Sequence, residues 1–453
     1  MKVTLVICPQ VNPDKPPLSL AYLTAYLTER NIDVSCLDFN IDLYSNSNIE
    51  KKKFWNSAMD GEWLHEGRYN SLNLIDDSVV QNWLEEIEKF SPQIVGFSLL
   101  STNYYSTLKL IMKLKARDNK VKIVIGGPEA YRLFGIGYLD ILNYSDALIL
   151  GEGEEIFYNL ISSIENNGEI TPGKGILIKK NDILLGGDNF NLIEDMDDIL
   201  FPEYSKFYLS EYKERGQLPL VFSRGCIGRC VFCFEKAYWK KFRCRSVGNV
   251  IEEIKHIKDK YKIWCFALND SLINGNMKFL SGFCDRVISE NIKISWWGMA
   301  RVNNQMTEQF LNKMVKAGCV QIAYGVESGS QRVLYSMHKN YDVDMMDKVL
   351  FNTYKAGIKP GINLMLGFPG EEEEDFQATC EFVKRNSRYV SYVNISTLGI
   401  EPFTEIYINR IAMGIDFKDS VNWRTLDGKN NYEIRLERAQ ILSKVVNEYV
   451  GKI

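Results

Sequence analysis

The feature that most constrains the fold is an alternation of short apolar runs with helical patterns, which occurs twice along the 453 residues. Apolar runs without internal alternation are typical of strands buried on both faces, and helices between such strands favour parallel sheets. The alternation pauses over residues 167–217, where we expect a linker with a small hairpin. Because the chain is too long for one ordinary domain, we predict an α/β protein with two main domains.

The first domain is predicted over residues 1–166 as a Rossmann-like, doubly wound parallel sheet with helices on both faces. The expected strands are Val3–Cys8, Val34–Phe39, Ile94–Leu100, Lys122–Gly126 and Ala147–Leu150. Residues 41–80 form a polar and aromatic segment that is long for a connection in this fold. We expect an insertion that caps a ligand crevice, with a disordered excursion as the alternative.

Ligands of such sheets bind at the carboxyl ends of the strands. The candidate contacts that follow the third, fourth and fifth strands are Ser98, Thr102, Gly126, Gly127, Pro128, Gly151, Glu152 and Gly153. Glycine lets the backbone approach a flat or bulky ligand, although Gly-Gly-Pro after a strand is also ordinary turn chemistry. No G-x-G-x-x-G follows the first strand, which disfavours a dinucleotide.

The second domain is predicted over residues 218–400 as a partial (β/α)₆ barrel of the TIM type, with a short helical tail over 401–453. The expected strands are Pro219–Ser223, Ile263–Leu268, Ile294–Gly298, Val320–Gly325, Gly361–Leu366 and Tyr392–Leu398. Barrel active sites lie at the carboxyl ends of the strands. The residues there are Asn269, Asp270, Arg301, Glu327, Ser328, Gly367, Phe368 and Pro369. We expect the tail helix to close the side or mouth of the barrel.

Three cysteines, Cys226, Cys230 and Cys233, follow the first barrel strand with C-x₃-C-x₂-C spacing. Three thiolates can hold three irons of a 4Fe-4S cluster and leave the fourth iron open to another ligand. Ordinary thiols and a zinc site are the alternatives, although zinc usually requires a second closely spaced Cys or His pair. Cys244, past this loop, is a further ligand, a hydrogen donor or an inert thiol.

The cysteine loop, with Phe232 before its last cysteine, resembles the signature of the radical S-adenosylmethionine (SAM) superfamily. The runs Gly325–Ser330 and Gly367–Glu371 resemble the later barrel motifs of that superfamily, in the same order. The first third resembles the cobalamin-binding domain that precedes this barrel in one large subfamily. The resemblance implies three cofactors: a 4Fe-4S cluster, SAM and cobalamin.

In this superfamily SAM chelates the open iron, and one electron from the cluster cleaves it to methionine and a 5′-deoxyadenosyl radical. The radical then removes a hydrogen atom from the substrate. The resemblance implies that Arg301 pairs with the SAM carboxylate and that Glu327 accepts from its amine or ribose. Phe232 and Phe368 would lie near the adenine. No Gly-Gly-Glu follows the second barrel strand, and Asp270 is the expected substitute or else an N-cap.

The D-x-H-x-x-G pattern that supplies a histidine to cobalt is absent. His65 lies in the predicted insertion without an aspartate two residues before it. We therefore expect cobalamin to bind without a lower histidine ligand. A methyl group on cobalt would then pass to a substrate radical, with one SAM supplying the methyl group and a second SAM the radical.

The leading hypothesis is thus C-methylation of an unactivated carbon in a small molecule, lipid or peptide. The alternatives are cyclisation, rearrangement or oxidation by the same radical, a tRNA-modifying relative, and a non-enzymatic cluster sensor. A net charge of −4 and a tail of mixed charge disfavour nucleic acid as a partner. We expect an external electron donor such as flavodoxin or ferredoxin. No apolar run approaches a membrane span, and we expect a cytoplasmic location.

Overall fold

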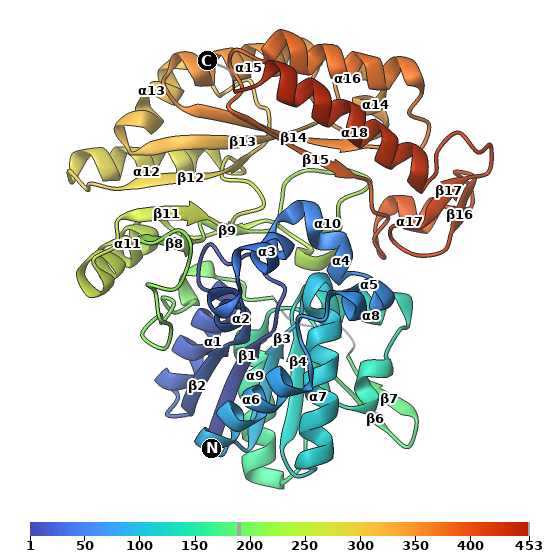
Figure 1. Cartoon of the computed structure of the whole chain (residues 1–453). Coiled ribbons are helices and arrows are strands. Elements are labelled where there is room, and N and C mark those ends of the chain that lie inside the picture. The colour runs from blue at the N-terminus through green and yellow to red at the C-terminus, as the bar shows by residue number, and fades with distance from the viewer. Residues whose placement is uncertain (188–191, 452–453) are drawn as a thin grey trace. The chain divides into compact units, whose positions relative to one another are not determined.

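The computed structural model describes residues 1–187 and 192–451 and divides into two compact units, Met1–Gln217 and Leu218–Ile453 (Figure 1). The division falls after Gln217, and the segment 167–217 belongs to the first unit. The tail over 401–453 is likewise part of the second unit.

The first unit is built on a seven-stranded sheet with the order β2-β1-β3-β4-β5-β6-β7. The first five strands pair in parallel, and the hairpin strands β6 and β7 extend the sheet in antiparallel pairing. The strands are β1 (Lys2–Ile7), β2 (Asp33–Asp38), β3 (Ile94–Ser98), β4 (Lys122–Gly126), β5 (Ala147–Ile149), β6 (Ile176–Lys180) and β7 (Ile183–Gly186). The strand order reverses between β1 and β3, and crevices for ligands form at such a reversal.

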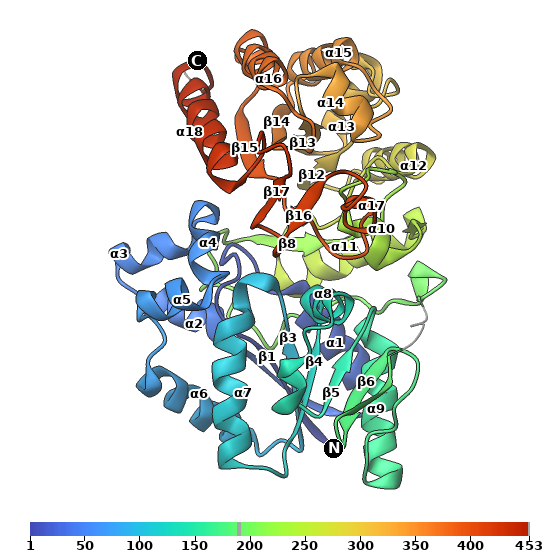
Figure 2. The same cartoon turned by 90° about the vertical axis from the view of Figure 1, so that its right-hand side faces the viewer.

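Helices cover both faces of this sheet, as a doubly wound fold requires. Helix α1 packs with α9, and α6 packs with α7 on the other face (Figure 2). The longer helices are α1 (Leu18–Glu29), α2 (Phe39–Asn46), α6 (Asp77–Phe90), α7 (Tyr104–Arg117), α8 (Pro128–Ile136) and α9 (Gly153–Asn167). The apolar spacing in α6 and α8 was not recognised from the sequence.

The insertion predicted over 41–80 is ordered and helical, so the disordered alternative was wrong. It contains the short helices α3 (Ile49–Lys52), α4 (Asp60–Trp63) and α5 (Glu66–Leu72). Buried tryptophans hold it together, because the indole of Trp55 donates to Asn40 Oδ1 at 2.6 Å and that of Trp63 donates to Phe54 O at 2.8 Å. Helix α4 contacts the turn Ser101–Asn103 that follows β3, so the insertion lies beside the crevice.

The second unit contains a six-stranded sheet in which each strand pairs with the next strand along the chain. The one interruption is a two-stranded hairpin, β9 and β10, which lies in the sequence between β8 and β11. The order is β15-β14-β13-β12-β11-β8, and the pairs from β11 to β15 are parallel. The strands are β8 (Gln217–Leu220), β11 (Cys265–Leu268), β12 (Ser295–Ala300), β13 (Cys319–Glu327), β14 (Lys359–Leu366) and β15 (Tyr392–Thr397). This is the predicted partial barrel.

Helices follow each of these strands and cover the outside of the sheet. They are α10 (Phe234–Trp239), α11 (Val247–Tyr261), α12 (Met277–Ser289), α13 (Glu308–Lys316), α14 (Gln331–Ser336), α15 (Val343–Lys355), α16 (Glu373–Asn386), α17 (Glu405–Asn409) and α18 (Tyr432–Tyr449). Helix α18 packs against α16, β14 and β15, and so closes the side of the barrel at its last strand (Figures 1 and 2).

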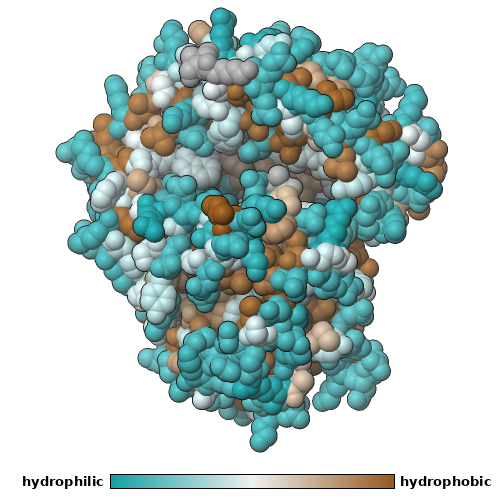
Figure 3. Space-filling view, viewed as in Figure 1, coloured by the Kyte–Doolittle hydropathy of each residue, from teal (hydrophilic) through white to brown (hydrophobic). Residues whose placement is uncertain are grey.

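The surface in Figure 3 is mainly hydrophilic, with smaller apolar areas between the polar side chains. Apolar residues in such small groups are normal on protein surfaces. Within the part of the chain that the structure describes, no helix is both long and apolar enough to cross a membrane.

Candidate cofactor sites

The three cysteines lie on a loop that begins with a tight turn. Strand β9 (Ser223–Arg224) pairs with β10 (Arg243–Cys244), which brings Cys244 opposite Ser223. Gly225 then adopts a φ of +87°, and a Cβ atom there would lie 2.4 Å from the carbonyl oxygen of Lys241. A side chain cannot occupy that space, so the entry to the loop requires glycine.

The middle of the loop is held by backbone hydrogen bonds at Val231. Its N–H donates to Met337 O at 3.3 Å, and its carbonyl oxygen accepts from the N–H of Ile406 at 3.1 Å. The Val231 side chain is buried in an apolar cluster with Phe368 and Trp423. Two distant segments, one after α14 and one in the tail, therefore fix the position of the loop.

The three thiols are half-buried, and those of Cys226 and Cys230 flank Gly228. Gly228 N–H donates to Cys226 Sγ at 3.2 Å, and a Cβ atom on Gly228 would lie 3.2 Å from that sulfur and 3.7 Å from Cys230 Sγ. Burial raises the pKa of the Cys233 thiol to about 12 and also raises the pKa of Cys226. Thiolates in such surroundings need a nearby positive charge or a metal.

Arg301 supplies one such charge. Its Nη1 atom would lie 3.8 Å from a Cβ atom on Gly228, and its positive charge offsets part of the rise that burial causes in the pKa of Cys226. The residue is anchored by Asn274, whose side chain accepts from Arg301 N at 3.0 Å and donates to Arg301 O at 2.8 Å. The Nη2 atom of Arg301 is buried and has no hydrogen-bond partner among the described residues. A buried guanidinium nitrogen without a partner fits an incoming carboxylate.

Lys339 is a second cation, which no sequence pattern predicted. It is 7% exposed, and its Nζ atom lies 2.9 Å from Glu327 Oε1 and 5.5 Å from the centre of the Phe232 ring. Tyr341 lies beside both cations, with its ring 5.6 Å from the Arg301 guanidinium. These residues follow α14 rather than a strand, so the barrel rule did not select them.

Glu327 reaches Lys339 because the backbone is irregular at the end of β13. The pairing register between β13 and β14 shifts between Gly325 and Glu327, and Glu327 has a φ of +68°. A non-glycine residue in this conformation costs energy and is typical of functional sites. The Glu327 carboxylate thus lies beside Lys339, near the cysteine loop.

Two predicted contacts have structural roles instead. Asp270 is fully buried and accepts from Phe222 N at 3.0 Å and from both Ser223 N and Ser223 Oγ at 2.6 Å. It therefore holds the segment that leads into the cysteine loop, and Asn276, not Asp270, caps α12. Ser328 is also buried, and its hydroxyl bonds Ser330 N and Thr379 Oγ1. Asn269, by contrast, lines a cavity in the barrel.

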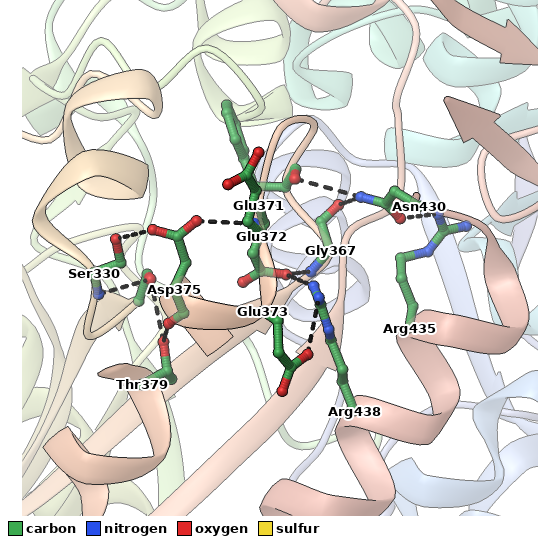
Figure 4. Close-up of polar contacts among 12 residues, drawn as sticks. Ser330, Gly367, Glu371, Glu372, Glu373, Asp375, Thr379, Asn430, Arg435 and Arg438 are labelled. Carbon is green, nitrogen blue, oxygen red and sulfur yellow. Dashed lines mark hydrogen bonds and ion pairs between the residues drawn. The ribbon is translucent and has the colours of Figure 1, made fainter. Parts of the chain in front are cut away.

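The loop Gly367–Gly370 after β14 is held by the tail (Figure 4). Gly367 N donates to Glu371 Oε2 at 2.7 Å, and Asn430 Nδ2 donates to Gly367 O at 2.9 Å. Gly367 has a φ of +81°, and a Cβ atom there would lie 2.2 Å from Arg435 Cδ. The backbone of this loop is therefore fixed from both sides.

Phe368 and Pro369, which were predicted to contact a cofactor, differ in how far they are buried. Phe368 is 2% exposed, because its ring packs in the apolar cluster with Val231. Pro369 is half-buried. Glu371 forms an ion pair with Arg438 of α18 at 3.0 Å, and burial raises the pKa of the Glu371 carboxyl. The tail is thus part of the site.

In the first unit, the predicted residues Ser98 and Thr102 lie at and just after the carboxyl end of β3, next to the loop that follows β1. Thr102 Oγ1 donates to Gln10 O at 2.7 Å, which joins the loops after the two strands. Asn103, which was not predicted, donates to Ser98 O at 3.0 Å and to Cys8 O at 3.4 Å. The Ser98 hydroxyl lies 3.1 Å from that of Ser19.

The glycines after β4 and β5 differ in whether their positions leave room for a side chain. Gly127 has a φ of +107°, and a Cβ atom there would lie 2.5 Å from Leu99 O, so only glycine fits. Gly126 and Gly153 have ordinary room for a Cβ atom. The neighbouring predicted residues have structural roles. Pro128 is the first residue of α8, and Gly151 has a φ of +97°. The buried Glu152 side chain accepts a hydrogen bond from Ile193 N at 2.6 Å.

Comparisons with known proteins assign both units. Residues 220–383 match the Radical SAM superfamily, and residues 69–161 match the B12 binding domain. These matches confirm the two resemblances found in the sequence. They also confirm the expected cofactor classes, namely a radical SAM centre and cobalamin.

Several curated proteins are similar over most of the chain. An uncharacterised methyltransferase of Pyrococcus horikoshii is 26% identical over 94% of this chain and 86% of its own length. Cytidylyl-2-hydroxyethylphosphonate methyltransferase of Streptomyces wedmorensis is 25% identical over 81% of this chain and 73% of its own. The anaerobic magnesium-protoporphyrin IX monomethyl ester cyclase of Rubrivivax gelatinosus is 22% identical over 71% of this chain and 60% of its own length.

Solved structures share the fold. The radical SAM methyltransferase TsrM of Kitasatospora setae, solved with cobalamin and a [4Fe-4S] cluster, has a TM-score of 0.70 at 16% identity and covers 91% of this chain and 78% of its own. The cobalamin-dependent S-adenosylmethionine radical enzyme OxsB has a TM-score of 0.65 at 18% identity, and the match covers 90% of this chain and 55% of the OxsB chain. These similarities confirm the predicted α/β architecture.

We predict that the substitution Arg438→Met lowers the free energy of unfolding of the second unit by about 3–5 kcal/mol, because it leaves the buried Glu371 carboxylate without its partner. The matched control is Arg424→Met, which breaks the exposed ion pair with Asp416 and costs about 1 kcal/mol or less. Urea unfolding monitored by circular dichroism measures both values. Equal losses in the two variants would contradict a special role of the buried pair.

Proposed function

We propose that this chain, a member of the radical SAM superfamily that carries a B12-binding domain, is a methyltransferase that acts on an unactivated carbon. The observation that carries the proposal is the group formed by the three-thiol loop and Arg301, whose buried Nη2 atom has no partner among the described residues. The methyltransferase relatives, which align with up to 94% of the chain, support methylation as the reaction.

The residues present fit the three cofactors. Cys226, Cys230 and Cys233 would hold the cluster, since all three thiols are half-buried on one short loop and two of them, Cys226 and Cys230, flank Gly228. Arg301 would bind the SAM carboxylate in a fork, as its buried Nη2 atom has no partner among the residues that the structure describes. When bound, the cluster and SAM supply a 5′-deoxyadenosyl radical, and cobalamin supplies a methyl group.

The chain's own residues would bind and orient these groups. Lys339 neutralises Glu327 and keeps its positive charge close to the cysteine loop. The backbone of Gly367–Gly370, fixed by Glu371 and Asn430, would offer its polar groups to the adenosine. The crevice between β1 and β3 would hold cobalamin without a histidine ligand, since the loop after β1 contains none. An external reductant would supply the electron.

A second candidate is oxidative cyclisation without methyl transfer. The similarity to the magnesium-protoporphyrin IX monomethyl ester cyclases favours it, since one of these aligns with 71% of this chain. Both reactions begin with hydrogen abstraction by the same radical. They differ in the fate of SAM, because only methyl transfer yields S-adenosylhomocysteine as well as 5′-deoxyadenosine.

The cofactor content is tested by anaerobic reconstitution with iron, sulfide and hydroxocobalamin, followed by metal analysis. We expect about four irons and one cobalt per chain. The variant Cys230→Ala is expected to lose most of the iron and keep the cobalt, because the cysteine loop and the crevice belong to different units. The control Cys380→Ala, which alters a buried thiol of α16, should retain both metals. Iron without cobalt would refute the methyltransferase proposal.

The reaction is tested by giving the reconstituted protein methyl-deuterated SAM and a strong reductant and quantifying its products. Methyl transfer predicts label on cobalamin together with S-adenosylhomocysteine, whereas 5′-deoxyadenosine alone would favour the cyclase-type reaction. Arg301→Met should lower 5′-deoxyadenosine formation at least about tenfold, since one charge-assisted bidentate contact is lost. The exposed Arg388→Met serves as the control. Unchanged cleavage in Arg301→Met would refute its role.

A further inference from the structure

The interior of the barrel in the second unit contains an open cavity of about 510 Å³. Its polar lining consists of four carboxamides and one phenol, from Asn269, Gln321, Asn363, Asn394 and Tyr392. The remaining lining residues are apolar and include Trp297 and Met299. Among the residues that line it, none carries a charge.

This neutral lining differs from the charged group beside the cysteine loop. Met299 lines the cavity on β12, and Arg301 follows two residues later, past the end of that strand. On β13, Gln321 and Ala323 line the cavity, whereas Glu327 ends the strand. Arg301 shares the face of Met299, because alternate residues of a strand point the same way. Glu327 lies past the register shift, but its carboxylate reaches the inner side of Gly325, where a Cβ atom would lie 2.8 Å from Glu327 Oε1. The barrel interior therefore has a charged layer and a neutral layer.

The carboxamides in the neutral layer are paired in a defined way. Asn363 and Asn394 lie opposite each other in the register of β14 and β15, and Asn394 Nδ2 donates to Asn363 Oδ1 at 2.9 Å. This pairing leaves the amino group of Asn363 and the carbonyl oxygen of Asn394 for a ligand. One donor beside one acceptor is complementary to the edge of a carboxamide or a lactam.

The ring and hydroxyl of Tyr392 form the part of the cavity wall beside these two asparagines. Gly361 leaves room for the ring of Tyr392, because a Cβ atom at Gly361 would lie 2.0 Å from its Cζ atom. The Tyr392 hydroxyl accepts from Gln321 Nε2 at 3.3 Å, and burial raises the pKa of this phenol, which keeps it neutral. The lining offers an anionic ligand no counter-charge, whereas its carboxamides and phenol offer hydrogen bonds to a neutral ligand.

We propose that this cavity binds an uncharged part of the substrate that carries an amide or lactam edge, remote from the carbon that reacts. The assignment of the ligand as substrate rests on the proposed function, but the chemistry of the cavity does not. Substrates with a phosphate or carboxylate at this position are rejected. Binding energy gained here would orient the substrate for attack at the charged layer.

The test uses two probes of matched size, nicotinamide and nicotinate. Nicotinamide carries a carboxamide where nicotinate carries a carboxylate. Binding to the full chain without added cofactors is measured by ligand-observed NMR titration. We expect nicotinamide to bind at least about tenfold more tightly than nicotinate, and the double variant N363L/N394L to lose at least about tenfold of that affinity. The control N312L alters an exposed carboxamide on α13 and should leave binding unchanged.

The single variant N394L guards against misfolding, since Asn394 is exposed and its replacement should spare the fold. It removes the acceptor and should weaken nicotinamide binding several-fold. Preference for nicotinate, absence of nicotinamide binding, or unchanged affinity in N394L would overturn the proposal. Because the titration requires neither iron nor cobalt, its failure is distinguishable from failure of the cofactor analysis.

Discussion

The backbone hydrogen bonds of Val231 are the contacts on which the rest of the cluster site depends. They hold the cysteine loop between the segment that leads from α14 to Lys339 and the tail segment that contains Ile406. Loops of this kind are usually mobile, and a loop that carries three metal ligands must keep their spacing to within a fraction of an ångström. Here one residue connects the loop to both a cation-bearing segment and the tail.

The same design recurs at the loop after β14. Glu371 accepts from Gly367 N and from Arg438, so one buried carboxylate links the loop to α18. Phe368 and Val231 share an apolar cluster with Trp423, so the two loops that face the site are packed together through the tail. Residues 401–453 thus support the cofactor site as well as covering the barrel.

Much of this arrangement follows from sequence rules, and its exceptions have physical reasons. The rule that barrel sites lie at strand ends selects Arg301 and Glu327, and the structure places both side chains near the cysteine loop. It could not tell which way each residue after a strand points. Asn269 faces the barrel, so the next side chain, that of Asp270, points away and bonds Phe222 N and Ser223 N.

Other features have no local signature. Lys339 and Tyr341 approach the site only because α14 turns the chain back toward the cysteine loop, and no pattern in the sequence reports that turn. The hairpin of β6 and β7 was recognised, but its pairing with β5 at the sheet edge was not, because two short strands carry no information about their neighbours. Packing, rather than local propensity, decides these positions.

The distribution of charge in the barrel gives its two layers different tasks. Lys339 is already paired with Glu327, whereas Arg301 retains a buried nitrogen without a partner among the described residues, so an incoming carboxylate is directed to Arg301. The carboxamides deeper along the strands satisfy each other in part and exclude charge. An anion entering the barrel is therefore stabilised at the cysteine loop and destabilised beyond it. With the proposed ligands bound, this gradient would separate a zwitterionic cofactor from a neutral substrate group.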